Sequence, residues 1–184
     1  MGRDKALLPW QDGTFLSTAI RALQRETELV IVVAGKNAPN LTPVIYSNAA
    51  FVVINPHPEL GQMSSLQRGL EEVLNRGRDA ALVTLVDRPA PRDETIRQLK
   101  SAFLQADDNI WAAVPEFNGR HGHPFLVGRE MIEAFLRAPA TSTARDVEHA
   151  HQQHILYIPV DDPLIAVNVN TEEDYEKLRL GLTA

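Results

Sequence analysis

A stretch of mostly apolar residues covers residues 80–86 and runs directly into Asp87. An apolar run without polar alternation is typical of a strand that is buried on both faces, as in a parallel sheet covered by helices. Pro89 ends the stretch, because proline has no N–H to donate to a sheet. Asp87 is therefore expected at the carboxyl end of a central strand, the edge at which open α/β sheets bind ligands.

A carboxylate at that edge has two interpretations. Asp87 either binds a metal ion or a hydroxyl group, or it caps the helix that follows. Asp93 is better placed to cap the helix expected over residues 94–105. This favours the binding role for Asp87.

Strand and helix patterns alternate along the rest of the chain. Apolar runs predict further strands at residues 29–34, 51–54, 110–114, 125–127, 155–160 and 166–169. Helical periodicity predicts helices at residues 14–25, 63–75, 129–136 and 143–152, and a capping box at Thr171 to Asp174 opens the last helix. Residues 36–43, rich in Pro and Asn, are expected to form a loop. The alternation predicts one α/β domain over residues 1–184, a three-layer α/β/α sandwich.

One antiparallel strand is expected within an otherwise mostly parallel sheet. Asn118-Gly119 lies between two apolar runs and is the commonest signal for a tight hairpin turn.

Composition narrows the class of protein. A hydrophobic content of 44% and a charged content of 23% are typical of a globular domain. The absence of cysteine excludes a disulfide framework and thiolate metal sites. No run is long and apolar enough to span a membrane, and the polar start lacks a signal peptide, so we expect a cytoplasmic protein. A net charge of −6 without a basic stripe argues against nucleic acid as a partner.

Two segments near the expected ligand edge carry candidate binding groups. Lys5 could neutralise bound phosphates, or it could be a solvated lysine. Gly61, Ser64 and Ser65 stand at a helix start, where N–H and O–H donors could bind a base, a sugar or a phosphate. Their alternative interpretation is a plain cap by one of the two serines.

The last candidates follow the final expected strand. Period-2 alternation places Asn168 and Asn170 on one face, and their amide oxygens suit a hard cation such as Mg²⁺. They could equally be turn or cap residues. His121 and His123 form an H-x-H pair, a weak metal signal without a third ligand in view.

Five segments in this order resemble the signatures of the MobA-like nucleotidyltransferases. Residues 1–9 resemble the end of R-M-G-x-x-K-x-L-L-P, and residues 61–66 resemble G-M-S-x-S-L, closest to the molybdenum cofactor cytidylyltransferase branch. Residues 87–89 resemble D-Q-P, with Arg88 in place of Gln. Residues 119–124 resemble G-x-x-G-H-P, and residues 168–175 resemble N-x-N-T-P-E-D-x. The resemblance covers the chain from residue 1 to about residue 180.

The resemblance implies a Rossmann-like fold of the nucleotide-diphospho-sugar transferase type and a Mg²⁺-dependent nucleotidyl transfer. A nucleoside triphosphate, by this reading CTP, would give its NMP to a phosphorylated acceptor such as molybdopterin cofactor, with release of pyrophosphate. Asp87 with Asn168 or Asn170 would hold the Mg²⁺, and Lys5 would stabilise charge on the phosphates.

By the same resemblance, Gly61, Ser64 and Ser65 would contact the base, and Gly122 and His123 would lie where the acceptor enters. The residues leave the acceptor, the choice between CTP and GTP and the oligomeric state open.

The chain also departs from the family pattern. Residues 1–184 contain no counterpart of the first strand and the L-A-A-G-x-S-x-R loop, which supply backbone N–H groups to the triphosphate. We therefore expect weak or absent turnover from residues 1–184 and restored activity when about twenty upstream residues are added. The last motif carries asparagine in place of aspartate, which should weaken Mg²⁺ binding somewhat.

Two other functions remain alternatives. One is a sugar-1-phosphate or phospho-lactate-type nucleotidyltransferase on the same fold, although its acceptor half is usually longer. The other is a nucleotide-binding protein that no longer catalyses, which the missing loop would favour.

Overall fold

The computed structural model describes residues 4–139 and 141–181, so residues 1–3 of the first signature lie outside the described residues. A short β1–β2 hairpin (Pro9–Trp10 and Gly13–Thr14) follows a 3₁₀ turn, η1 (Lys5–Leu7). The remaining strands are β3 (Ile31–Ala34), β4 (Phe51–Ile54), β5 (Ala80–Val83), β6 (Ala112–Phe117), β7 (Arg120–His121), β8 (Phe125–Gly128) and β9 (Ile155–Pro159). The helices are α1 (Phe15–Gln24), α2 (Ala38–Ser47), α3 (Gln62–Asn75), α4 (Asp93–Gln105), α5 (Arg129–Arg137), α6 (Ala144–Ala150) and α7 (Glu172–Arg179).

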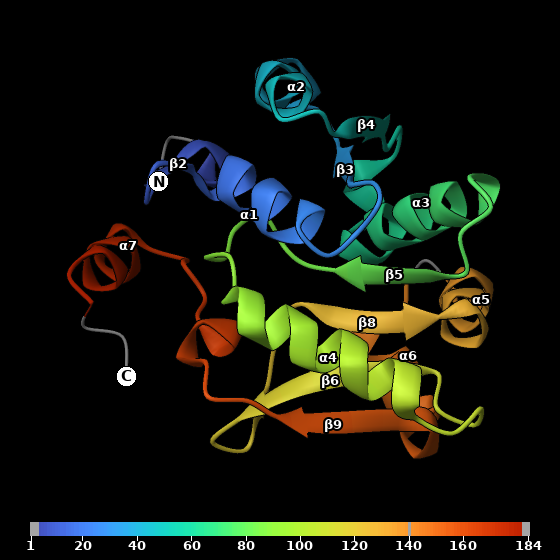
Figure 1. Cartoon of the computed structure of the whole chain (residues 1–184). Coiled ribbons are helices and arrows are strands. Elements are labelled where there is room, and N and C mark those ends of the chain that lie inside the picture. The colour runs from blue at the N-terminus through green and yellow to red at the C-terminus, as the bar shows by residue number, and fades with distance from the viewer. Residues whose placement is uncertain (1–3, 140, 182–184) are drawn as a thin grey trace.

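The strands form one small and one larger sheet besides the hairpin. β3 and β4 pair in parallel. The larger sheet has the order β5-β8-β6-β7, and β9 pairs with β6 in parallel. β5, β8, β6 and β9 succeed one another down the view of Figure 1. The expected α/β class is confirmed, with a mixed sheet in which β5–β8, β6–β8 and β6–β7 are antiparallel.

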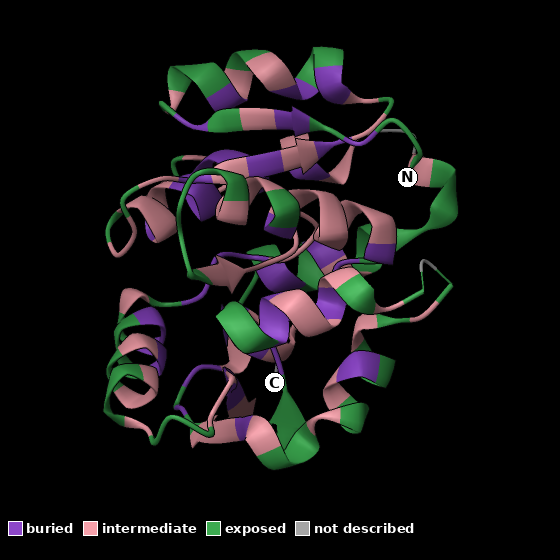
Figure 2. Cartoon of the chain, turned by 90° about the vertical axis from the view of Figure 1, so that its right-hand side faces the viewer, coloured by how far each residue is buried: buried purple, intermediate pink, exposed green. Residues whose placement is uncertain are grey.

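Helices cover both faces of the sheet, because successive residues of its central strands point to opposite faces and are buried on both. Leu126 on β8 and Ala113 on β6 pack against Leu99 of α4. Their neighbours Val127 and Ala112 point the other way, into a cluster with residues of α3 and α5. α1 lies on the α4 side, and buried residues mark the inward sides of the helices in Figure 2. These layers are the expected three-layer arrangement.

The Asn-Gly hairpin is confirmed. Asn118 and Gly119 have φ values of 50° and 73°, the left-handed conformations that a two-residue hairpin turn needs. They join β6 to β7, with Phe117 opposite Arg120.

The expected loop at residues 36–43 is wrong, because most of it belongs to helix α2. Pro39 lies in the first turn, where a missing N–H costs little, although Pro43 lies inside the helix. The helix buries Leu41 and Ile45, four residues apart, against α1 and the β3–β4 pair. Burial of this stripe offsets the poor helix propensity.

The expected strand at residues 166–169 is also wrong. Residues Pro163–Ala166 form a 3₁₀ turn, η4, and residues 167–170 belong to no strand among the described residues. The strand after residue 80 is shorter than expected, since β5 ends at Val83. Across residues 4–139 and 141–181, no helix combines the length and apolarity that crossing a bilayer requires.

Candidate functional site

The Lys5 side chain contacts a residue close to the C-terminal helix α7. It lies in η1, where the Asp4 carboxylate accepts from the Ala6 N–H at 3.1 Å and Ala6 is buried. The turn therefore holds the Lys5 side chain at the surface, and its Nζ donates to Asn170 Oδ1 at 3.3 Å. Asn37 donates to the same Asp4 carboxylate at 2.7 Å and fixes the turn to the start of α2. Two predicted site residues, 165 positions apart, are thus in contact.

The start of α3 is held by an asparagine that follows β4. Asn55 is 4% exposed, and its Nδ2 donates to Ser64 Oγ at 2.9 Å and to Ser65 Oγ at 3.0 Å. Ser64 Oγ in turn donates to the Gly61 carbonyl at 2.8 Å. The three predicted base-contacting residues therefore form one fixed unit. The sequence interpretation did not single out Asn55, although an amide directly after a strand was a usable signal.

The interpretation of Ser64 or Ser65 as a plain helix cap is wrong. The N-cap is Gly61, which has φ 94° and makes no side-chain cap. Only glycine adopts this conformation without strain. The first N–H groups of α3 have no intrahelical partners, and no side chain caps them, so they remain available to an acceptor.

Asp87 lies in the turn after β5, four residues beyond the last paired residue, and it is half-buried. It is not a helix cap. The expected cap at Asp93 is also wrong, because α4 begins at Asp93 and the N-cap position is Arg92. The start of α4 is instead held by Asp162, whose Oδ2 accepts from the Arg92 N–H at 2.8 Å. Asp162 lies 70 positions after Arg92 in the sequence, so sequence spacing gave no signal for this role.

Three loops meet at the Ile165 carbonyl. The His123 N–H donates to it at 3.0 Å, and Arg88 Nη1 lies 3.5 Å from it. A Cβ on Gly122 would stand 2.2 Å from the same oxygen, so only glycine fits there. The turn after β5, the β7–β8 loop and η4 are therefore packed together.

The Arg88 and His123 side chains carry unsatisfied polar atoms. Arg88 Nε and His123 Nδ1 are buried without a hydrogen-bond partner among the described residues. The pKa of His123 is lowered to about 4, mainly by burial and also by the neighbouring Arg88 charge, while the Val83 backbone acts in the opposite direction. Burial also lowers the pKa of Arg88, and Asp87 opposes that shift. Buried polar atoms without a partner, one of them on the cationic Arg88, can bind a polar or anionic group of a ligand.

Asn168 and Asn170 lie on the same exposed side, with Val169 buried between them. The expected alternation is therefore present although the strand is not. The Asn170 N–H donates to Asp174 Oδ2 at 3.0 Å, so the start of α7 holds this segment. The Asp87 carboxylate and the amide oxygens of Asn168 and Asn170 are oxygen donors of the kind that a hard cation accepts.

The H-x-H pair does not form a metal site within the structure. The His121 ring stacks on Tyr157 at 4.1 Å and pairs with Glu116, whereas His123 packs against Phe125. Within the described ranges, no group of three or more His, Cys, Asp or Glu residues could hold a metal ion.

A layered α/β fold with an uncapped helix start and polar loops at one edge is the arrangement in which open α/β proteins bind ligands. Residues 1–156 match the MobA-like NTP transferase domain. The chain belongs to this family, whose members are nucleotidyltransferases.

The curated relatives agree. The chain is 24% identical to the molybdenum cofactor cytidylyltransferase of Escherichia coli, over 95% of this chain and 86% of the relative. It is 28% identical to the molybdenum cofactor guanylyltransferase of Xanthomonas euvesicatoria, over 97% and 87% of the two chains. A crystal structure of Rv0371c from Mycobacterium tuberculosis, in complex with manganese, has the same fold: the TM-score is 0.78 at 22% identity, over 96% and 92% of the two chains.

Proposed function

We propose that the chain transfers CMP from CTP to a phosphorylated acceptor such as molybdopterin cofactor. In this reaction an acceptor phosphate oxygen forms a bond to the α-phosphorus of CTP. The bond between that phosphorus and the bridging oxygen breaks, and pyrophosphate leaves with the electron pair. The protein contributes mainly by positioning the reactants and offsetting their charge.

The Lys5–Asn170 contact carries the proposal. It joins the first and the last family signature in space, although Nζ and Oδ1 belong to residues 165 positions apart. The Lys5 ammonium group can donate to more than one kind of acceptor, so it can move from the Asn170 amide to a phosphate oxygen when a nucleotide binds. We assign Lys5 this role.

The start of α3 is proposed to bind the cytosine. Asn55 fixes Ser64 and Ser65 from behind, so the helix start is rigid before a ligand binds. The uncapped N–H groups after Gly61 would then donate to the base carbonyl. Similarity to a cytidylyltransferase favours CTP, whereas similarity to a guanylyltransferase favours GTP, so the choice of base has to be measured by nucleotide binding.

Asp87, Asn168 and Asn170 fit a Mg²⁺ ion by their chemistry. The donors are one carboxylate and two amides, all oxygen ligands, and the amides are exposed. Bound there, the ion would supply positive charge to the triphosphate. The manganese in the Mycobacterium tuberculosis protein supports a divalent ion in this fold.

Gly122 and His123 are proposed to face the acceptor. The low pKa of His123 keeps the ring neutral near pH 7. A neutral ring beside Arg88 can then accept or donate a hydrogen bond to a phosphorylated acceptor, while Arg88 supplies the positive charge.

Calorimetry with CTP, GTP and ATP in the presence of Mg²⁺ tests the base, and pyrophosphate release tests turnover. CTP-selective binding supports the proposal. Binding without turnover, both in residues 1–184 and in a form extended upstream, would support the non-catalytic alternative.

Asp87→Ala tests the metal assignment. In a form that turns over, we expect Asp87→Ala to lower kcat/KM by at least about a hundredfold, since metal-linked charge stabilisation contributes several kcal/mol. Asp108→Ala is the matched control, because Asp108 is an exposed carboxylate in the turn between α4 and β6. Unchanged turnover in Asp87→Ala, with the fold intact by circular dichroism, would make Asp87 a structural residue.

A further inference from the structure

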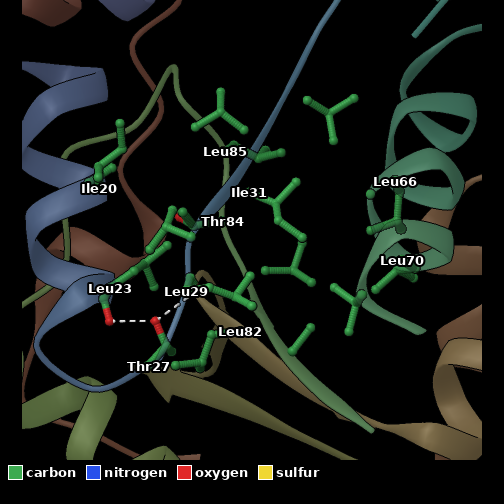
Figure 3. A pocket seen from close by; sticks show the side chains of 18 of the residues that line it. Ile20, Leu23, Thr27, Leu29, Ile31, Leu66, Leu70, Leu82, Thr84 and Leu85 are labelled. Atoms are coloured by element: carbon green, nitrogen blue, oxygen red, sulfur yellow. Dashed lines mark hydrogen bonds between the residues drawn. The ribbon is translucent and has the colours of Figure 1, made fainter. Parts of the chain in front are cut away.

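Strand β4 forms the outer edge of the β3–β4 pair. It pairs with β3 and with no other strand of the described residues, and it lies at the upper edge of the molecule in Figure 1, with α2 beside it. The other side of β3 borders an apolar cavity of about 580 Å³, which Figure 3 shows from close by. The edge of this pair that faces solvent is therefore β4.

Two residues of β4 direct their main-chain groups away from β3. The Phe51 N–H donates to the Val30 carbonyl at 2.9 Å, and the Asn55 N–H donates to a β3 carbonyl at 2.8 Å. Successive residues of a strand direct these groups to opposite sides. Val53 is therefore turned toward β3, whereas the N–H and C=O groups of Val52 and Ile54 point outward from the sheet.

The sequence of β4 lacks the features that usually keep an edge strand from pairing with another chain. Lysine and proline residues commonly have this effect. Strand β4 has neither, since all four of its residues are apolar. By contrast, β7 carries Arg120 and β9 ends at Pro159. The outward groups of β4 are thus open to a further strand.

The chain around β4 is also uncharged and rich in exposed apolar side chains. Residues 37–56, which include α2 and β4, contain no Asp, Glu, Lys, Arg or His. Six large apolar side chains are exposed in the part of the chain that the structure describes, and four of them lie within residues 46–60: Tyr46, Phe51, Ile54 and Leu60. Exposed apolar residues that gather in one region indicate an interaction surface.

A second copy of the chain is the partner that this surface fits. The net charge of −6 makes two copies repel each other, and the repulsion is weakest where neither copy carries a charged side chain. A strand edge is also complementary to itself, because a two-fold axis sets it antiparallel to its own copy. A strongly charged partner would find no opposite charge to bind on residues 37–56.

We propose that the chain forms a two-fold symmetric dimer through β4. With Val53 on the axis, Val52 lies opposite Ile54 of the partner subunit, and the two residues exchange main-chain hydrogen bonds. The symmetry repeats this pair on the other side of the axis. Every outward main-chain group of Val52 and Ile54 is then paired, and the two β3–β4 pairs become one continuous sheet.

The same arrangement covers apolar side chains. Val52 packs on the cluster that contains Leu41 and Ile45 of α2, so α2 covers the face of the sheet to which Val52 and Ile54 point. A two-fold axis perpendicular to the sheet places α2 next to its own copy on that face, and Ile54, which is 49% exposed in one chain, is buried between them. Asn55 follows Ile54 directly, so the pairing also holds the residue that fixes the start of α3.

Sedimentation velocity of the whole chain tests the dimer without any nucleotide, so the result is independent of the proposed transfer reaction. Ile54→Lys is the test variant, because it places a charge in the interface on both copies. Leu104→Lys is the matched control, since Leu104 is 74% exposed on α4, in a different part of the fold.

We expect a doubled mass for the wild type and for Leu104→Lys. The dissociation constant of the dimer should rise at least about tenfold in Ile54→Lys, because symmetry makes the substitution act twice. The proposal is overturned by a dimer that is equally stable in both variants. It is also overturned by a wild type that stays monomeric at about 0.1 mM, where a dimer with a Kd of about 10 μM would be mostly associated.

An engineered cysteine tests the register. The chain contains no cysteine, so Val53→Cys introduces a single thiol. Directly opposite residues in a non-hydrogen-bonded antiparallel pair have Cα atoms about 4.5 Å apart, within the range of about 4.4–6.8 Å that a disulfide spans. Because Val53 is 7% exposed, chance collisions do not bring two such thiols together.

In glutathione redox buffer, Val53→Cys should form a disulfide-linked dimer, which a non-reducing gel separates from the monomer. Leu104→Cys, at the control position, should form mainly the mixed disulfide with glutathione. A folded, dimeric Val53→Cys protein without the intersubunit disulfide would overturn the proposed pairing. If Val53→Cys does not fold, the sedimentation of the wild type and the two lysine variants still decides the proposal.

Discussion

Asp162 is the residue whose removal should do most to disconnect α4 from the loops of the candidate site. Its carboxylate is 1% exposed and accepts three hydrogen bonds: from the Arg92 N–H at 2.8 Å, the Thr95 hydroxyl at 2.8 Å and the Leu164 N–H at 3.1 Å. It therefore fixes the start of α4 to η4. The negative charge also lies at the positive end of the α4 helix dipole.

The expected cost of Asp162→Ala follows from these contacts. A hydrogen bond to a charged group contributes about 1.5–3 kcal/mol, and each buried donor left unpaired costs about 1–3 kcal/mol. Because Thr95 is also buried, water cannot replace the lost acceptor without rearrangement. We expect the free energy of unfolding to fall by about 3–5 kcal/mol, a large part of the 5–15 kcal/mol typical of a domain.

Urea unfolding followed by tryptophan fluorescence measures this loss. The midpoint should fall while the slope m stays constant, as expected for a change in stability alone. Asp161→Ala is the matched control, because Asp161 is exposed and contributes only its backbone carbonyl, to Arg92 Nη1. That control should stay within about 0.5 kcal/mol of the wild type.

A double-mutant cycle with Thr95→Val isolates the side-chain pair. The coupling between Asp162→Ala and Thr95→Val should be about 1–2 kcal/mol, since the two groups are in direct contact. If Asp162→Ala destabilises the protein no more than Asp161→Ala, the carboxylate is not what holds α4, and the reasoning fails.

Three further predictions concern the site. Gly122→Ala should lower the free energy of unfolding by about 1–3 kcal/mol or more, because its Cβ would stand 2.2 Å from the Ile165 carbonyl oxygen. Urea titration measures this loss, and an unchanged midpoint would mean that η4 moves aside and that the steric argument is wrong. His123, with its pKa lowered to about 4, should make the folded state less stable as the pH falls from about 6.5 to about 4, by up to about 3 kcal/mol, because only the unfolded state binds the proton there. A His123→Phe variant should lose that part of the pH dependence, and an unchanged profile would contradict the burial argument. Lys5→Ala should reduce kcat/KM about 10–100-fold in an active form while changing stability by less than about 0.5 kcal/mol, because its contact with Asn170 is exposed; equal turnover would remove Lys5 from the phosphate site.

Local pattern predicted much of the framework. The apolar runs at β3, β4, β6, β8 and β9 and the periodicity of α1, α3 and α5 were each visible in the sequence, because burial of one face imposes a regular spacing. The Asn118-Gly119 turn was predictable for a local reason, since few residues adopt its backbone conformation. The family signatures also indicated which loops carry polar groups.

Local pattern failed where a distant contact outweighed propensity. Residues 38–47 form a helix against their Pro and Asn content because Leu41 and Ile45 find an apolar partner surface. The start of α4 is held by Asp162 and not capped by Asp93, because Asp93 is the first residue of the helix and a buried carboxylate from another segment accepts from the Arg92 N–H. Neither the helix at residues 38–47 nor the contact at the start of α4 can be predicted from residues that are close in the sequence.

The sequence by itself determined the class of fold, the order of most elements and the set of candidate site residues, because these depend on short-range periodicity and on residue chemistry. Only the tertiary structure decided which of those residues meet. The contact of Lys5 with Asn170 and the fixing of Ser64 and Ser65 by Asn55 join segments that are distant along the chain or lie in different elements. Such contacts depend on how whole layers pack, and packing is a property of the assembled chain.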